Sequence, residues 1–345
     1  MIKIIKPGLL TTIQDLGRYG FQKFGVIVSG VMDSLSHRIA NLLVGNEENA
    51  PTLEITMVGP VIEFERDTLI SICGGDLSPS IDGKFVPLWR PVLVKKGSQL
   101  RFGQCKAGCR SYLAVAGGFD VPRVMGSAST YLRAGIGGFK GRPLKTGDEL
   151  KLSPPNNRSV QMIHDFSTKI GDQKFVATKW SVSAEFIPIS NKIPSIRVIR
   201  GRQYQLFSKE SQKSFFREPF EITTQSDRMG YRLKGPILSL TSAEEMISEA
   251  VNFGTIQVPP DGNPIVLLAD RQTTGGYPKI GQVATVDLPY IAQLKPGDKI
   301  KFVKVSHEEA QRLYLERERE IQQLKRALSI KWKGEMQHAC CRFEL

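Results

Sequence analysis

Short runs of alternating apolar and polar residues, separated by turn residues, make up most of the chain. The runs dominate residues 53–152 and return with the same texture over residues 194–305. One of them surrounds Asp82-Gly83, a dipeptide typical of two-residue hairpin turns. The pattern predicts a mainly β protein with two β regions.

Helical spacing is confined to a few segments. Leu35, Ile39 and Leu42 repeat at helical spacing between the candidate caps Asp33 or Ser34 and Gly45, which predicts a helix. Ser242 with Glu245 forms a capping box that predicts one short helix in the second β region. The Pro- and Asn-rich stretch 153–175 is typical of a linker or domain joint.

The last part of the chain differs from the rest. Ser306 and Glu309 form a second capping box, and a helical apolar stripe continues through residue 328. Charged residues of both signs cover the other face of this stripe. We expect a C-terminal helix that docks on the body or projects from it, in preference to a binding arm.

Charge and composition narrow the classes of function. The 345 residues carry 47 Lys+Arg and 34 Asp+Glu, a net charge of +13, and the length suggests two domains. Basic residues are spread out, with no block of five, which disfavours nucleic-acid binding. Residues 307–328 hold five acids and five bases. The excess charge therefore lies in the body, where anionic substrates or an acidic partner could use it.

Several further classes are disfavoured. No apolar run approaches the roughly 18 residues of a membrane span, and the N-terminus does not resemble a signal peptide. Five cysteines, an odd number, favour free thiols in the cytoplasm. The Cys and His spacing predicts no structural zinc site, and the chain lacks a Walker A loop.

Two signatures occur once in each β region, in the same order. Arg133-x-x-x-Gly137-Gly138-Phe139 matches Arg271-x-x-x-Gly275-Gly276-Tyr277. The stretch 144–152, with a Lys-x-Gly-Asp turn before an alternating strand, matches 294–302. This internal repeat predicts two β domains of related fold.

The second copy of the Arg–Gly-Gly signature, which begins at Arg271, is the main candidate for a functional site. Glycine-rich turns can present backbone N–H groups to anions, and arginine adds a planar fork for carboxylate or phosphate. The alternative is a barrel rim with tight glycine corners and a buried salt bridge. The density of polar side chains over 270–279 favours a functional loop. Asp15, Arg18, Asp33 and Arg38 form a second cluster, either a site or a buried ion-pair network.

Several long motifs resemble the allophanate-hydrolase subunit 2 family, which includes the KipA proteins. They stand, in order, at residues 7–18, 29–33, 38–46, 53–56, 114–118, 133–138 and 270–278. Together they cover about residues 2–305, and the tail lies outside the resemblance. The resemblance implies a fold of two cyclophilin-like β-barrels with a few short helices. We expect domains at 1–155 and 194–305, a joint at 156–193 and a helical tail at 306–345.

Within this family, a free-standing chain of this length is similar to the C-subunit of an ATP-dependent 5-oxoprolinase. The resemblance therefore implies that function. That function implies two partners, a KipI-like B-subunit together with a LamB/YcsF-like A-subunit. ATP with Mg is expected, bound either on this chain or on a partner, and no biotin is expected on this chain. The family leaves two alternatives, a regulatory KipI antagonist that controls a sporulation kinase and a carboxyltransferase component of a biotin-dependent urea carboxylase.

The candidate residues fall into two sets. We expect catalytic, anion-contacting roles for a first set, in which Asp270 orients the others: Asp270, Arg271, Thr273 and Lys279. We expect substrate binding by a second set: Arg18, Asp33, Arg38, Asn41, Glu54, Arg133, Gly275, Gly276 and Tyr277.

Overall fold

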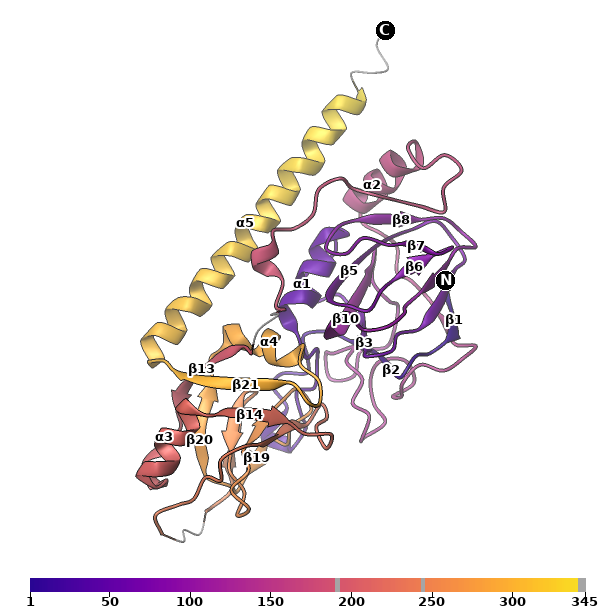
Figure 1. Cartoon of the computed structure of the whole chain (residues 1–345). Helices are drawn as coiled ribbons and strands as arrows, with labels where there is room; N and C mark the ends of the chain where they lie inside the picture. The colour runs from indigo at the N-terminus through magenta and orange to yellow at the C-terminus, as the bar shows by residue number, and fades with distance from the viewer. Residues whose placement is uncertain (190–192, 243–245, 341–345) are drawn as a thin grey trace. The chain divides into compact units, whose positions relative to one another are not determined.

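The computed structural model describes residues 1–189, 193–242 and 246–340. The chain divides into two compact units. Figure 1 shows the whole chain coloured by residue number. Unit 1 comprises residues 1–17, 34–188 and 318–345, and unit 2 comprises residues 18–33 and 189–317. Each unit therefore combines segments that are far apart in the sequence.

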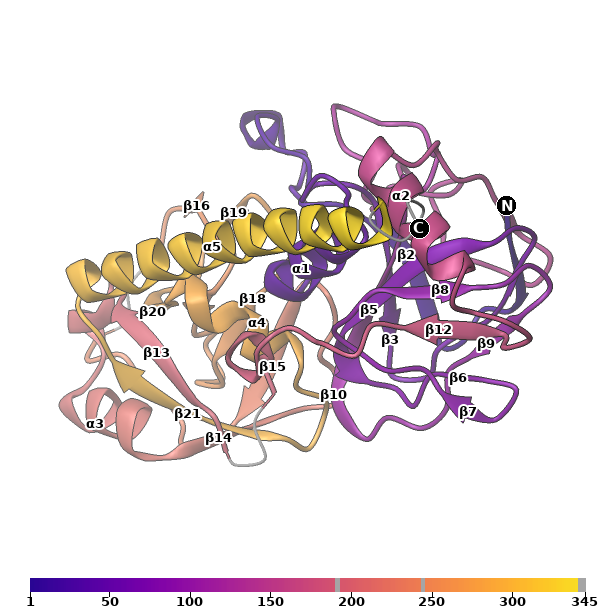
Figure 2. The ribbon, with the colours of Figure 1, turned by 90° about the horizontal axis from the view of Figure 1, so that it is seen from above.

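Unit 1 contains two six-stranded antiparallel sheets. The first has the order β11(Glu149–Leu150), β1(Ile2–Lys6), β4(Val61–Phe64), β9(Gln99–Arg101), β6(Ser80–Ile81) and β7(Lys84–Phe85). The second, which Figure 2 shows with β3, β5, β8 and β12 labelled, has the order β12(Phe175–Ala177), β8(Val92–Val94), β5(Thr68–Asp76), β10(Ala107–Val115), β3(Thr52–Thr56) and β2(Leu10–Gln14).

The inner faces of these sheets share one apolar core. Ile4 and Phe64 come from the first sheet, and Ile72 and Leu113 from the second, and all four are fully buried. The outer face of the second sheet contacts α1(Ser34–Leu43), where Ser71 Oγ donates to Ala40 O at 2.6 Å. The spacing-based prediction of this helix is confirmed.

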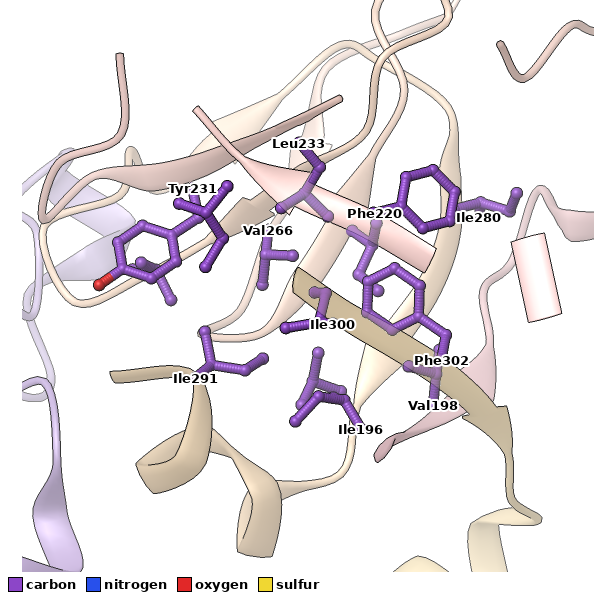
Figure 3. Packing of buried hydrophobic residues seen from close by; sticks show 14 of the residues in the cluster. Ile196, Val198, Phe220, Tyr231, Leu233, Val266, Ile280, Ile291, Ile300 and Phe302 are labelled. Carbon is purple, nitrogen blue, oxygen red and sulfur yellow. The ribbon is translucent and has the colours of Figure 1, made fainter. Parts of the chain in front are cut away.

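Unit 2 is built on a closed seven-stranded barrel. Its strands follow the order β13(Ser195–Arg200), β20(Lys279–Val283), β17(Thr255–Gln257), β18(Ile265–Leu267), β15(Gly230–Lys234), β14(Pro219–Ile222) and β21(Lys299–Lys304). The closing pair β13–β21 is parallel. Figure 3 shows Val198, Phe220, Val266, Ile300 and Phe302 converging on the barrel interior, where they are buried. The mainly β class predicted from the sequence is confirmed.

The repeated Lys-x-Gly-Asp turn has the same hydrogen bonds in both units. In unit 1, Lys145 N donates to Asp148 Oδ2 at 2.7 Å, and Gly147 N donates to a strand carbonyl, Ile4 O, at 2.8 Å. In unit 2, Lys295 N donates to Asp298 Oδ2 at 2.9 Å, and Gly297 N donates to Ile222 O at 2.8 Å. The sequence repeat therefore corresponds to a repeated local structure.

The remaining helices differ from the sequence expectations. Segment 156–193, expected as a joint, carries α2(Asn157–Ser167) and β12 of unit 1. Asn156, taken as a linker residue, is the N-cap of α2, and its side chain accepts from Ser159 N. In unit 2, α3(Lys209–Arg217) and α4(Leu288–Ala292) were not predicted, because each is too short to show a clear apolar stripe. The helix expected from Ser242 and Glu245 lies outside the described residues.

The C-terminal helix is α5(His307–Cys340), longer than the stripe predicted. Its capping serine is confirmed, since Ser306 Oγ accepts from Glu309 N at 3.1 Å. From Glu318 onward the helix belongs to unit 1, where Ile321, Leu328 and Trp332 are buried. The docked arrangement is therefore the one observed.

Four 3-10 turns and a two-stranded ribbon complete the described elements. The turns are η1(Gln22–Phe24), η2(Ala184–Phe186), η3(Tyr204–Leu206) and η4(Thr285–Asp287). The ribbon pairs β16(Glu249–Ala250) with β19(Thr274–Gly275), and it holds the glycine-rich loop described next.

Candidate functional site

The glycine-rich loop, residues 270–279, connects two barrel strands of unit 2. It leaves the buried end of β18, pairs through β19 with β16 and enters β20 at Lys279. Val251 N donates to Thr273 O at 3.1 Å, which fixes the backbone of the loop. A Cβ on Gly275 would lie 2.4 Å from Gln257 Nε2, so any larger residue there would have to displace the end of the Gln257 side chain. The loop therefore has a defined conformation, and Tyr277 is 45% exposed on it.

Asp270 is held by a buried arginine that the sequence analysis missed. The Asp270 carboxylate accepts from Arg228 Nε at 2.9 Å, from Arg228 Nη2 at 3.1 Å and from Ser29 Oγ at 2.7 Å. Arg228 also donates to Gly30 O, and both members of the ion pair are buried. Asp270 thus contacts Arg228 and Ser29, rather than the loop residues it was expected to orient. Arg228 follows a polar turn with no motif of its own.

Arg271 is a half-buried cation at the start of the loop. Its Nε and Nη1 make long hydrogen bonds, 3.4 Å to Val251 O and 3.3 Å to Leu268 O, and the guanidinium lies 5.9 Å from the Phe253 ring centroid. Within the described residues, no carboxylate lies at ion-pair distance from Arg271. Burial lowers the pKa of Arg271, and Tyr19 and Asp270 act in the opposite direction. A desolvated cation without an internal counterion favours an external anion.

Lys279, by contrast, already has a counterion. Its Nζ donates to Glu249 Oε2 at 2.8 Å, and Glu249 also pairs with Arg202 at 3.0 Å. The hydrogen bond from Lys279 lowers the pKa of the Glu249 carboxyl. The Lys279 ammonium is therefore engaged in holding β16 beside the loop.

Arg18 and Asp33 lie in unit 2 with the glycine-rich loop and are fully buried. Arg18 N donates to Val28 O at 2.7 Å, and Asp33 Oδ2 accepts from Gln293 Nε2 at 2.8 Å. The first bond closes the loop between Arg18 and Val28, and the second attaches the end of the segment 18–33 to Gln293.

Three further candidates lie around α1 in unit 1. Arg38 pairs with Glu48 at 2.7 Å and with Glu318 at 2.6 Å, and hydrogen bonds to these carboxylates raise its pKa. Asn41 Nδ2 donates to Ala50 O at 2.8 Å, and its Oδ1 accepts from Asn46. Arg38 and Asn41 therefore anchor α5 and the turn after α1. The ion-pair interpretation fits Arg38.

Glu54 belongs to a buried polar layer between the second sheet and α1. Tyr112 OH donates to Glu54 Oε2 at 2.9 Å across the β10–β3 pair, and both residues are buried. On α1, His37 Nδ1 lies 2.9 Å from Thr52 Oγ1, and burial lowers the pKa of His37 to about 4. Sequence reasoning missed His37 and Tyr112, although polar residues in an otherwise apolar pattern were a usable signal.

Arg133, the counterpart of Arg271 in the repeat, lies elsewhere. It is exposed in the turn between Tyr131 and Ile136 in unit 1. The structure therefore gathers Asp270, Arg271, Thr273, Gly275, Gly276, Tyr277 and Lys279 in one loop, places Arg38, Asn41 and Glu54 around α1, and leaves Arg133 apart.

The described residues contain no group of three or more His, Cys, Asp or Glu that could hold a metal ion. No described helix is both long enough and apolar enough to cross a lipid bilayer.

The fold and the site together define the class of this protein. It is a mainly β protein with a closed barrel and a glycine-rich loop whose Arg271 favours an anion. Residues 24–304 match the family model of the carboxyltransferase domain, subdomain A and B. The chain belongs to this family.

Its curated relatives include two proteins of nearly the same length. It is 41% identical over 324 residues to the 5-oxoprolinase C-subunit of Escherichia coli, covering 94% of this chain and 97% of that one. It is 38% identical to the 5-oxoprolinase C-subunit of Haemophilus influenzae, covering 96% and 100%. These relatives confirm the resemblance found in the sequence.

A solved structure shares the fold. The urea amidolyase of K. lactis superposes with a TM-score of 0.82 and 32% identity, over 93% of this chain and 20% of that one. The chain thus corresponds to one module of that larger protein.

Proposed function

We propose that this chain is the C-subunit of a heteromeric ATP-dependent 5-oxoprolinase, which cleaves 5-oxo-L-proline to L-glutamate. The observation that carries the proposal is the end-to-end match to two curated proteins of that name, at 41% and 38% identity. The name of these relatives implies an assembly, so we expect activity only when the partner proteins are present.

The reaction requires activation of a stable amide. The lactam carbonyl oxygen attacks the γ-phosphorus of ATP, and ADP leaves. Water then adds to the activated carbon, and the ring C–N bond breaks with a proton transferred to nitrogen, which leaves a γ-glutamyl phosphate. A second water hydrolyses this acyl phosphate and releases inorganic phosphate. The products are glutamate, ADP and phosphate, so the site must hold a carboxylate, a phosphoryl group and a developing oxyanion.

Arg271 is suited to one of these anionic groups. Its guanidinium is half-buried and has no ion-pair partner among the described residues, whereas Arg228 and Lys279 are each paired with a carboxylate. Binding an anion there would replace water around an already desolvated cation. We assign Thr273 and Tyr277, on the same loop, to contacts with the same ligand.

The partners and the nucleotide site follow from the same proposal. We expect two partner proteins, one KipI-like and one LamB/YcsF-like. One half-buried cation fits a single carboxylate or phosphoryl group, and a triphosphate with Mg needs more charge than the loop offers. We therefore propose that a partner protein supplies most of the ATP site.

Reconstitution tests the proposal. The purified KipI-like and LamB/YcsF-like partners are mixed with 5-oxoproline and ATP, and glutamate release is measured with and without this chain. We expect release to require all three proteins. Unchanged release without this chain would exclude the proposed function.

A second candidate is carboxyl transfer, favoured by the TM-score of 0.82 to K. lactis urea amidolyase. To test it, this chain is mixed with a biotin-dependent partner protein, and carboxylation of urea is measured. The third function, that of a KipI antagonist, needs only binding to the KipI-like partner, and is compatible with the first.

A further inference from the structure

A small loop of unit 2 exposes two large aromatic side chains. It consists of residues 18–28, hereafter the 18–28 loop, with η1 at its tip. Tyr19 is 67% exposed and Phe24 is 69% exposed. Exposed aromatic residues grouped on one element commonly mark protein interfaces.

The base of the loop is firmly attached. Arg18 N donates to Val28 O at 2.7 Å and closes the loop, and Arg18, Ile27 and Val28 are buried. Compact surface loops whose ends are joined in this way are frequently functional.

The tip is held by its own hydrogen bonds. Phe24 N and Val26 N donate to Phe21 O at 3.0 and 3.4 Å, and Gly25 N donates to Gln22 O at 2.9 Å. Gly20 N donates to Gln22 Oε1 at 2.9 Å. The backbone of the tip is therefore preformed, which lowers the entropic cost of binding.

The loop also adjoins the candidate site. Ser29, the residue that follows the loop, donates from Oγ to Asp270 at 2.7 Å, and Asp270 is the chain neighbour of Arg271, so the base of the loop lies beside the glycine-rich loop. A protein docked on Tyr19 and Phe24 would thus lie close to the glycine-rich loop.

The charge of the loop selects the kind of partner. Residues 18–28 contain no carboxylate, and Lys23 Nζ lies 4.9 Å from the Phe24 ring centroid. In a symmetric dimer formed through this loop, both Lys23 side chains would lie in one interface to which neither loop contributes a carboxylate, which is unfavourable. An apolar pocket edged by carboxylates complements the loop much better.

We infer that the 18–28 loop is the docking element for a partner protein of the enzyme, which receives Tyr19 and Phe24 in an acid-edged apolar pocket. The inference rests on the proposed function for the identity of the partner. It adds that the partner covers the Arg271 region, so that the site is completed by the assembly.

The test is a binding measurement without substrate. The full chain and its Tyr19→Ser/Phe24→Ser variant are titrated with the purified KipI-like and LamB/YcsF-like partners, separately and mixed. We expect the double variant to bind at least about 100-fold more weakly, because central aromatic residues dominate such interfaces. Lys23→Glu should weaken binding about tenfold, more at low salt.

Phe85→Ser is the matched control. Phe85 is 50% exposed in unit 1 and has Lys106 Nζ 6.0 Å from its ring centroid, so it reproduces an exposed phenylalanine beside a lysine. We expect its affinity for the partner to stay within twofold of the wild type. Far-UV circular dichroism establishes that all variants are folded.

Three results of the binding measurement would overturn the inference. The first is that the double variant binds as tightly as the wild type. The second is that the double variant and Phe85→Ser lose the same amount of affinity, and the third is that the wild type binds neither partner. Sedimentation showing a homodimer that the double variant loses would assign the loop to a second copy instead. Binding that depends on the loop without any glutamate release would leave the docking inference standing and reject only the proposed function.

Discussion

Arg228 neutralises Asp270 through two hydrogen bonds, of 2.9 and 3.1 Å, and thereby leaves the adjacent Arg271 as the cation of the glycine-rich loop without an internal counterion among the described residues. Had Asp270 paired with Arg271 instead, the loop would offer no free positive charge.

This pairing predicts a large stability effect from one-sided substitution. Asp270→Ala leaves the 6%-exposed Arg228 without its carboxylate, so the free energy of unfolding should fall by about 3–5 kcal/mol. The double variant Arg228→Met/Asp270→Leu should recover most of the loss. Urea unfolding followed by far-UV circular dichroism measures both. A loss below about 1 kcal/mol in Asp270→Ala would contradict the buried ion pair.

His37 predicts a pH dependence of stability in unit 1. Burial lowers its folded pKa to about 4 from the ordinary value of 6.5, so the unfolded state binds the proton first as pH falls. Stability should therefore be full above about pH 7 and decline toward pH 4, by about 2 kcal/mol between pH 7.5 and pH 5.

The variant His37→Gln should lack this part of the pH dependence. Trp89, Trp180 and Trp332 all belong to unit 1, so tryptophan fluorescence during urea unfolding reports on the correct unit. An NMR titration of the wild-type imidazole gives the folded pKa directly. Equal pH slopes in both proteins, or a folded pKa near 6.5, would be inconsistent with a buried neutral His37.

The docking of α5 predicts that substituting two of its isoleucines has very different effects on the free energy of unfolding. Ile321 is 1% exposed and packs in unit 1, whereas Ile330 is 71% exposed on the same helix. Ile321→Ala should cost about 2–5 kcal/mol of unfolding free energy, and Ile330→Ala less than about 0.5. Urea unfolding by tryptophan fluorescence compares the two. Similar costs for both would mean that the helix does not dock as described.

Local features were the ones that the sequence could predict. Apolar spacing and a stop at Gly45 sufficed for α1, and Asp82-Gly83 sufficed for the β6–β7 hairpin, because neighbouring residues determine both. The Lys-x-Gly-Asp repeat was visible because one side-chain hydrogen bond, from Lys N to Asp, defines the turn.

The sequence alone could not predict which residues far apart in the chain pair with one another. Arg38 is separated by 280 residues from Glu318, and Arg228 by 42 from Asp270, and no local pattern links such partners. The same holds for the assignment of residues 18–33 to unit 2. The sequence thus identified Arg271 as a candidate, but its lack of an internal counterion needed the structure.

The central claim is that Arg271 binds an anionic group in the reaction of an assembled 5-oxoprolinase. Its most direct test is ATP-dependent glutamate release by the reconstituted assembly carrying Arg271→Ala, Arg271→Lys or the control Arg232→Ala. Arg232 is an exposed arginine of β15 whose side chain has no ion pair among the described residues.

Loss of one charge-assisted contact in the transition state should lower kcat/KM at least about 100-fold in Arg271→Ala. Arg271→Lys should restore part of the rate, and Arg232→Ala should match the wild type. Thermal unfolding and binding to the partner proteins should stay unchanged in all three variants. Full activity of Arg271→Ala in the assembled enzyme would contradict the claim.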